Sequence, residues 1–278
     1  MELRLAQIDA FADRLFEGNP AAVMPLPHWL DDAVLAQLAR ENNLSETAFF
    51  VSNVPSEAGE PPFEAPTYHL RWFTPAIEVD LCGHATLATS AFIFDDLHQA
   101  ATRLAFWTRS GWLAVERDAA GLITMELPTE TLDDVDVDPA IVDALGISIN
   151  GAMKGTDLVY FAESAEAIRS MAPNFAVLRS LPVRGLAVTA LGDEAGIDFV
   201  SRWFGAQAGI DEDPVTGSAH SQLAPYWSRV LERQELVARQ LSSRGGTLRC
   251  RVSSGRVRIS GGCVRYLDGT VYLAEAMG

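Results

Sequence analysis

The sequence predicts an α+β fold in which two similar halves each pack antiparallel strands around a central helix. An internal repeat is the first of three features that predict it. Arg71-Trp72-Phe73 recurs as Arg202-Trp203-Phe204. Each copy is followed by a glycine step, Cys82-Gly83-His84-Ala85 in the first half and Thr216-Gly217-Ser218-Ala219 in the second. Because these matches keep the same order, we interpret them as a duplication.

The nearly equal spacing of later glycines is the second feature, and it also favours a duplication into two domains. Gly83 precedes Gly111 by 28 positions, and Gly217 precedes Gly246 by 29. We therefore expect an N-terminal half at 1–128, to which a last strand at about 263–278 can be added, and a C-terminal half at 129–262.

The third feature is a pattern of strands and helices in the first half. Strand-like segments run over 3–11, 47–51 and 68–74, and Pro75 ends the last of them. Between them, Leu30–Arg40 has an apolar stripe at helical spacing, and the asparagines at 42 and 43 can end that helix.

The next segments predict the centre of the half and its outer hairpin. Ala85–Phe92 is small and apolar nearly all round, which indicates a helix buried on every side. A hairpin follows, with strands at 113–115 and 123–125 around a turn near Gly121. The second half repeats this plan, with strands at 248–252 and 257–259. The acidic stretch Asp133–Asp138, near the join, is expected to be a solvated linker or edge.

Composition excludes several classes of partner. The chain has 278 residues and a formal net charge of −16, so it lacks the positive surface that nucleic acids and anionic membranes require. Three cysteines without CxxC spacing are typical of a reducing compartment. The N-terminus carries early charges rather than a signal peptide, and no apolar run reaches membrane-spanning length. We expect a cytoplasmic protein.

The two glycine steps are candidate anion sites. Gly83-His84 and Gly217-Ser218 both lie where a loop is expected to become a helix. The first amides of a helix have no internal partners and carry the positive end of its dipole. If the two corners face each other across a cleft, they can hold a carboxylate and a developing enolate.

Three titratable residues are candidates for the chemistry. Glu46 begins an apolar strand, and a carboxylate buried there away from partners would have a raised pKa, which suits a general acid or base. Asp213 lies in an acidic run before the second glycine step, held by Pro214. His84 follows the first glycine and ionises near neutral pH, as a proton shuttle requires. Ordinary surface or helix-cap roles are the alternatives.

Other kinds of site find no support. The remaining histidines form no metal-ligand spacing with the cysteines, so no metal is assigned. The chain has neither a dinucleotide-binding GxGxxG after a strand nor a phosphate-binding Walker loop. Ser218 lacks the GxSxG context of a hydrolase nucleophile.

Several of these segments together resemble the phenazine biosynthesis-like (PhzF-like) family. The matching segments, in family order, are Asp9-Ala10-Phe11, Gly18-Asn19-Pro20-Ala21-Ala22-Val23, Ser45-Glu46-Thr47-Ala48-Phe49, Cys82-Gly83-His84-Ala85-Thr86 and Asp213-Pro214-Val215-Thr216-Gly217-Ser218-Ala219. The resemblance covers most of the chain, and its motifs are specific only in combination. It implies a diaminopimelate epimerase-like fold, an active site in the cleft between the halves, no cofactor and a homodimer.

The resemblance also implies roles for individual residues. The family's catalytic glutamate falls on Glu46, its supporting histidine on His84, its aspartate on Asp213 and its serine on Ser218. The family's backbone-amide pocket matches Gly83 and Gly217. With Asn19, Cys82 and Thr216 these residues make up the expected substrate site. The implied activity is a cofactor-independent isomerisation of a small anionic carboxylic acid.

Two other functions stay open at this stage. The wider superfamily includes racemases with a thiol at each helix start; Cys82 stands at the first position, but Thr216 stands at the second. A cysteine–threonine pair occurs in hydroxyproline dehydratases of the superfamily, so a thiol-dependent epimerase or dehydratase remains an alternative. A non-catalytic metabolite-binding protein of the same fold is the other.

Overall fold

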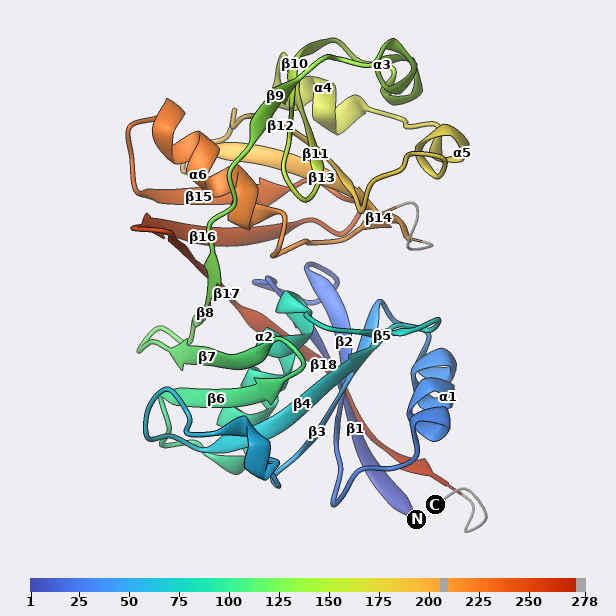
Figure 1. Cartoon of the computed structure of the whole chain (residues 1–278), viewed down its shortest axis with the longest axis vertical. Helices are drawn as coiled ribbons and strands as arrows, with labels where there is room; N and C mark the ends of the chain where they lie inside the picture. Colours follow the sequence, from blue (N-terminus) through green and yellow to red (C-terminus); the bar gives the residue numbers. More distant parts are fainter. Residues whose placement is uncertain (206–209, 274–278) are drawn as a thin grey trace. The chain divides into compact units, whose positions relative to one another are not determined.

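The computed structural model describes residues 1–205 and 210–273. The chain divides into two compact units, the first comprising Met1–Glu126 with the segment from Ser260 onward, and the second Leu127–Ile259. The C-terminal strand therefore belongs to the first unit, where it pairs with the N-terminal strand over Glu2–Ala10. Figure 1 shows these two strands running side by side in this unit.

The first unit is built mainly of strands. Its elements are β1 (Glu2–Ala10), β2 (Asn19–Pro25), α1 (Asp32–Asn42), β3 (Glu46–Val51), η1 (Ser56–Ala58), β4 (Thr67–Phe73), β5 (Glu78–Val79), α2 (Gly83–Phe92), the π-helical turn η2 (Ile93–Leu97), β6 (Arg103–Thr108), β7 (Gly111–Arg117), β8 (Ile123–Pro128) and β18 (Cys263–Tyr272).

The second unit has the same character. Its elements are β9 (Asp133–Val135), α3 (Pro139–Leu145), β10 (Ile149–Lys154), β11 (Leu158–Ala162), α4 (Ala165–Ser170), α5 (Phe175–Leu178), β12 (Leu186–Leu191), β13 (Phe199–Gly205), β14 (Ile210–Asp213), α6 (His220–Val230), β15 (Glu235–Gln240), β16 (Gly246–Ser253) and β17 (Arg256–Gly261).

Strand pairing repeats between the units. In the first, β1–β2 is antiparallel, β2–β3 parallel, β3–β4 antiparallel, β4–β6 parallel and β6–β7 antiparallel. In the second, β10–β11, β11–β12, β12–β13, β13–β15 and β15–β16 follow the same order of orientations. This confirms the pseudo-symmetric α+β fold. The sheets are mixed rather than purely antiparallel, because two connections in each unit return the chain in parallel.

The arginine of the repeated Arg-Trp-Phe segment forms the same ion pair in both units. Arg71 on β4 forms a bidentate ion pair with Glu78 on β5. Arg202 on β13 forms the equivalent pair with Glu212 on β14. The duplication therefore extends from sequence to individual side-chain pairs.

Both helices predicted in the first half are confirmed. α2 is buried along its length from His84 and contacts β1, β2, β3 and β18 (Figure 1). Its polar residues fit this apolar setting because their hydroxyls bond to carbonyls one turn earlier, as in Thr89 to Ala85 and Ser90 to Thr86. α1 ends at Asn43, whose left-handed backbone (φ 49°) closes the helix as expected.

The acidic stretch near the join is an edge and not a linker. Asp133–Val135 forms β9, which pairs with β10, and Asp138 caps α3 by accepting a hydrogen bond from the amide of Ala140. The chain passes between the units earlier, within β8 after Glu126, and returns within β17 after Ile259. A short polar segment between turn residues can be either a linker or an edge strand. Its pairing with β10 shows that this segment is an edge strand.

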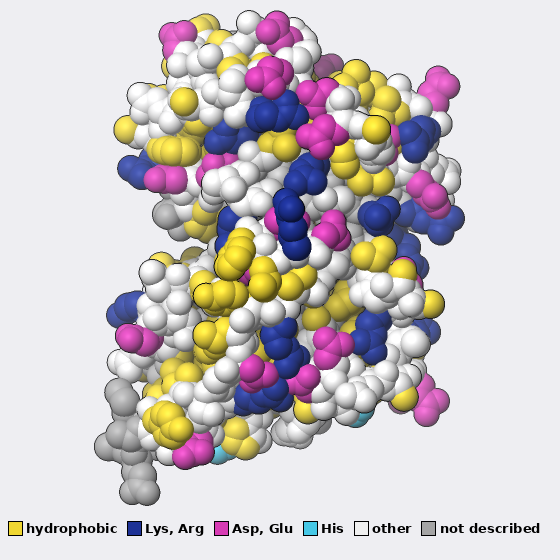
Figure 2. All heavy atoms as spheres, turned by 180° about the vertical axis from the view of Figure 1, so that it is seen from behind, with side chains coloured by type: hydrophobic (Ala, Val, Ile, Leu, Met, Phe, Trp, Pro, Cys, Tyr) yellow, Lys and Arg dark blue, Asp and Glu magenta, His cyan; other side chains and the backbone are white. Residues whose placement is uncertain are grey.

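Acidic side chains on the surface have basic side chains beside them. Figure 2 shows Lys and Arg side chains next to Asp and Glu on the visible face of the molecule. One such network joins Arg4 and Arg265 to Asp96 and Asp268 across η2, β1 and β18.

In residues 1–205 and 210–273, the helices all fall short of the length and apolarity needed to cross a membrane.

Candidate active site

The first glycine step forms a corner at the start of α2. Cys82 is extended (φ −143°, ψ 111°), and the helix begins at Gly83, as predicted. The hydroxyl of Thr86 donates to the carbonyl of Cys82 at 2.5 Å and fixes the turn. The side chain of His84 lies in the first turn and is only 7% exposed.

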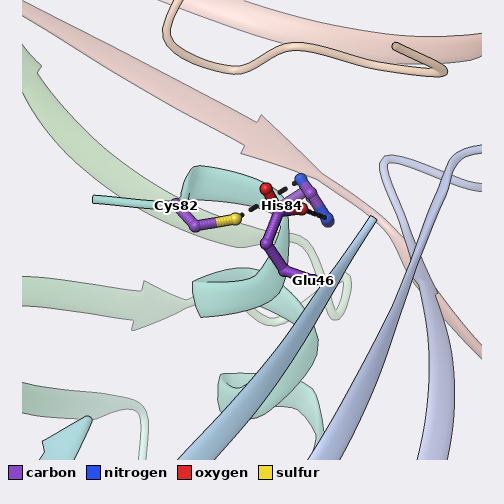
Figure 3. Close-up of side chains that lie close together, drawn as sticks. All are labelled: Glu46, Cys82 and His84. Atoms are coloured by element: carbon purple, nitrogen blue, oxygen red, sulfur yellow. Dashed lines mark hydrogen bonds and ion pairs between the residues drawn. The ribbon is translucent and has the colours of Figure 1, made fainter. Parts of the chain in front are cut away.

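Glu46 is brought to this corner by strand pairing. It is the first residue of β3, opposite Ala21 on β2, and its side chain is 13% exposed. Its Oε2 lies 3.1 Å from Nε2 of His84. Glu46 therefore does not lie away from partners, as considered for a buried carboxylate at this position, but has an imidazole as its neighbour (Figure 3).

The contact between Glu46 and His84 leaves both groups with unused bonding capacity. Oε2 and Nε2 are buried, and neither makes a hydrogen bond of good geometry with any described residue. The separation is that of an ion pair, while the direction is poor for a hydrogen bond. A buried polar pair of this kind is costly unless a further group completes it, as at sites that bind ligands.

Cys82 contacts the other side of the same imidazole. Its Sγ lies 3.6 Å from Nδ1 of His84, so His84 touches both neighbours (Figure 3). Burial raises the pKa of the Cys82 thiol to about 11, and the negative charge of Glu46 adds to this effect. The thiol is therefore protonated at neutral pH, which makes it a poor nucleophile at rest.

The pKa of His84 is shifted in the opposite sense to that of an ordinary buried histidine. Burial by itself lowers it, but Cys82 and Glu46 more than offset this, so it lies well above its usual value. Since a neutral thiol carries no charge, we assign the stabilisation of the imidazolium at neutral pH to the Glu46 carboxylate. The corner thus pairs an anionic acceptor with a cationic donor.

The same three side chains include the donor types that bind zinc. One atom from each of Glu46, Cys82 and His84 lies within 4.8 Å of the others. However, Cys82 and Glu46 contact opposite ring nitrogens, whereas a metal ion binds through one of them. The arrangement fits a linear proton relay better than a metal centre, and the absence of a metal stays a prediction.

The second glycine step has a different local structure. Gly217 to Ala219 form a hydrogen-bonded turn, and α6 begins only at His220. The prediction that Gly217 starts the helix is therefore three residues early. The chain at this turn is held by His220, whose Nδ1 bonds to the carbonyl of Thr216 at 2.8 Å. Thr86 plays the same part for Cys82 in the first unit.

Asp213 and Thr216 lie together beside this turn. Asp213 is the last residue of β14 and is buried, and its Oδ2 accepts a hydrogen bond from the Thr216 hydroxyl at 2.5 Å. Gln240 on β15 binds both residues, donating to the Asp213 carbonyl and accepting from the Thr216 amide. Sequence reasoning missed Gln240, because no motif surrounds it.

Asn19 begins β2 and is fully buried, opposite Ala10 on β1. It lies two residues before Ala21, the strand partner of Glu46. Together with Glu46, Cys82, Gly83 and His84, it places five of the predicted site residues in the first unit. Asp213, Thr216, Gly217 and Ser218 form the corresponding group in the second unit.

His220 gives a prediction about pH. It is fully buried, and burial lowers its pKa to about 4, although its bond to Thr216 works against this. Above about pH 6.5 it is neutral in both folded and unfolded chains; below that, the unfolded chain binds a proton that the folded chain refuses. We expect about 3 kcal/mol of stability to be lost between pH 6.5 and 4.

Urea unfolding at pH 7 and pH 4.5 measures this loss. His220→Asn keeps a donor for the Thr216 carbonyl but does not titrate, so its stability should fall less over the same interval. The difference between the two proteins removes the contribution of other groups, His84 included. Equal losses in both proteins would show that His220 is not the group responsible.

Comparison with known proteins decides the family. The family model described as phenazine biosynthesis-like protein matches residues 8–269. The chain belongs to the phenazine biosynthesis-like family. An uncharacterized isomerase of Pseudomonas aeruginosa is 47% identical to this PhzF-like chain, over 98% of the chain and 100% of the relative. A phenazine biosynthesis-like domain-containing protein of Homo sapiens is 37% identical, over 98% and 99%.

Solved structures agree on the fold. The crystal structure of a PhzF family protein from Enterococcus faecalis matches this PhzF-like chain with a TM-score of 0.90 and 42% identity, covering 98% of the chain and 100% of that structure. A hydroxyproline epimerase from Agrobacterium vitis matches with a TM-score of 0.61 at 9% identity, covering 97% and 91%. The latter likeness is one of fold alone, and it confirms the epimerase-like architecture predicted from the sequence.

Proposed function

We propose that this PhzF-like chain is a cofactor-independent isomerase that moves a proton within a small carboxylic-acid metabolite. The observation that carries the proposal is the buried contact of 3.1 Å between Glu46 and His84, in which neither atom has a well-formed hydrogen bond to the described residues. The isomerase names of its relatives, including one at 47% identity, support the same class of reaction.

Glu46 is the acid/base in this proposal. Its carboxylate removes a proton from a carbon made acidic by a neighbouring carboxyl or conjugated group, and the electron pair of the C–H bond passes into the substrate as an enolate. Glu46 then returns the proton at another carbon, so that no atom or electron is gained or lost. The raised pKa of His84 keeps a positive charge beside the reacting carboxylate.

The start of α2 supplies stabilisation for the negative charge that develops. The amides of the first helical turn lack carbonyl partners within the helix and point outward at its beginning. Gly83 has no side chain to shield them. Such preorganised donors act on charge that appears only during the reaction. Contributions from Asp213, Gly217 and Ser218, and the cleft between the halves, stay predictions.

Isotope exchange tests the proposal. The protein is incubated in ²H₂O with small amino and hydroxy acids and unsaturated carboxylic acids, without added cofactor and after treatment with a chelator. We expect deuterium to enter at least one substrate, detected by mass spectrometry and by loss of a proton NMR signal. Saturable binding of a metabolite without any exchange would instead support the non-catalytic alternative.

Cys82 is the rival acid/base, because its Sγ also contacts His84. Its pKa of about 11 and the threonine at the second thiol position argue against a thiol mechanism. We expect Cys82→Ala to lower the exchange rate by less than about tenfold, the effect of a lost contact rather than of a lost base. The ratio of kcat/KM for the two proteins measures this, and a loss of about a thousandfold would transfer the role to the thiol.

A further inference from the structure

A fully buried carboxylate in the second unit holds an arginine that is not buried. The side chain of Asp157 is 0% exposed, whereas that of Arg184 is 42% exposed. Nε of Arg184 donates to Oδ1 of Asp157 at 2.9 Å, and Nη2 donates to Oδ2 at 2.6 Å. A buried carboxylate needs a charged partner and further hydrogen bonds, and Arg184 supplies the charge and two of the bonds.

Two neutral side chains complete the support. Nε1 of Trp203 and Nε2 of Gln222 also donate to Oδ2 of Asp157, at 3.0 and 3.2 Å. The indole of Trp203 is itself enclosed, because a Cβ at Gly185 or Gly205 would come within 2.2 or 2.4 Å of it. The guanidinium of Arg184 lies over this ring, 5.4 Å from its centre. The arginine is therefore held in one orientation.

The outer edge of Arg184 faces the second glycine step. Its Nη1 donates to the hydroxyl of Ser218 at 3.3 Å. A guanidinium has five N–H groups, and these contacts with Asp157 and Ser218 engage three of them. Neutralising Asp157 requires only one edge of the guanidinium. Among contacts with residues 1–205 and 210–273, two donors of this half-exposed group are therefore left without a partner.

The duplication gives this position a functional meaning. Thr47 pairs with Phe73 in the first unit, and Leu186 pairs with Phe204 in the second. Matching the two Arg-Trp-Phe segments aligns Glu46 with Gly185, the neighbour of Arg184. Glu46 contacts the residue after Gly83, and Arg184 contacts the residue after Gly217. Corresponding corners thus carry an anion in one unit and a cation in the other.

We propose that Arg184 and Ser218 form a binding site for the carboxylate of a small organic acid. The inference rests on the proposed function, since that function supplies the chemical class of the ligand, a small carboxylic acid. A planar guanidinium that is fixed beforehand binds a carboxylate through charge-assisted hydrogen bonds at little entropic cost. Asp157, Trp203 and Gln222 act as positioning residues, because they hold Arg184 without meeting the ligand.

Calorimetric titration with benzoate and pyruvate, each against its uncharged primary amide, tests the site. The wild-type protein should bind at least one of the acids about tenfold or more tightly than its amide, as expected for a charge-assisted pair. Asp157→Asn/Arg184→Gln removes both charges together and so avoids an unpaired buried carboxylate. It should abolish the preference while retaining the wild-type circular dichroism spectrum.

Arg179→Gln is the matched control. Arg179 also binds one carboxylate, Asp211, through Nε and Nη2, but both partners are exposed. This variant should keep the preference for the acids. Arg184→Lys, which keeps the charge but loses the fork, should weaken it. The proposal is overturned if the wild-type protein shows no preference, or if the double variant or the lysine variant keeps all of it.

Failure of the anion site can be distinguished from failure of the proposed isomerase function. Glu46→Gln should bind the acids as the wild-type protein does, since it leaves Arg184 intact. If the protein prefers acids to their amides but exchanges no deuterium into any substrate, the anion site is supported and the isomerase function is overturned. If deuterium exchange depends on Glu46 but the preference for acids does not depend on Arg184, the isomerase is supported and the anion site is overturned.

Discussion

Replacing Glu46 with glutamine is expected to lower the rate of deuterium exchange into substrate by about 10²–10⁴-fold. The amide has nearly the shape of the carboxylate but cannot accept a proton from carbon. It also removes the negative charge that raises the pKa of His84, so the imidazole should lose its proton at lower pH. Exchange kinetics at saturating substrate, followed by mass spectrometry, measure the loss.

Glu78→Gln provides a control of similar burial in the same unit. Glu78 is 10% exposed, against 13% for Glu46, but it is fully engaged with Arg71 on the neighbouring strand. Its replacement should change stability more than the exchange rate of the folded protein. Equal exchange rates in wild-type protein and Glu46→Gln would remove Glu46 from the chemistry.

Gly18→Ala is expected to have the largest effect on folding, at about 4 kcal/mol or more. Gly18 has a left-handed backbone (φ +72°), and a Cβ there would lie 2.3 Å from the carbonyl oxygen of Ala10. That oxygen belongs to the backbone of β1 and cannot rotate away. Steric conflict with fixed backbone adds to the intrinsic penalty of about 1–2 kcal/mol for the left-handed conformation. Urea denaturation reports the change in free energy of unfolding.

Gly121→Ala separates the two components of this effect. Gly121 has a similar left-handed backbone (φ +86°), but a Cβ there would meet nothing within 4 Å. Its replacement should cost only the intrinsic penalty of about 1–2 kcal/mol. If both variants lost the same stability, the contact with Ala10 would have no energetic consequence. Because Asn19 follows Gly18 directly, the turn at Gly18 also fixes the start of β2, the strand that pairs with β3 at Glu46.

Local patterns identified the central helix and the hairpins for a simple reason. A run of small apolar residues such as Ala85–Phe92 can be helical only if it is buried all round, and the structure buries it so. Asn43 ends α1 because asparagine tolerates a left-handed backbone. These outcomes depend on residues within a few positions of each other, so a sequence contains the information directly.

The structure brings two of the candidate residues together. Glu46 and His84 lie 38 positions apart in the chain and are in contact, while their catalytic roles stay predictions. The second glycine step differed in its backbone hydrogen bonds. The amide of His220 bonds to the carbonyl of Gly217 in a turn, whereas the amide of Thr86 bonds to the carbonyl of Cys82 as in an α-helix. The sequence did not identify Gln240 or Arg184, since neither belongs to a motif. Their hydrogen-bond partners Thr216 and Asp157 lie 24 and 27 positions away along the chain.

By itself the sequence determined the duplication, the central helix, the family and the identity of the acid/base candidate. Periodicity, glycine spacing and residue type are written along the chain, and each acts over a few residues. Only the tertiary structure decided that the acidic stretch is an edge strand, that Cys82 and Glu46 meet opposite nitrogens of His84, and that Asp157 orients Arg184. These outcomes depend on strand register and on which buried groups become neighbours, and both are set by packing between distant segments.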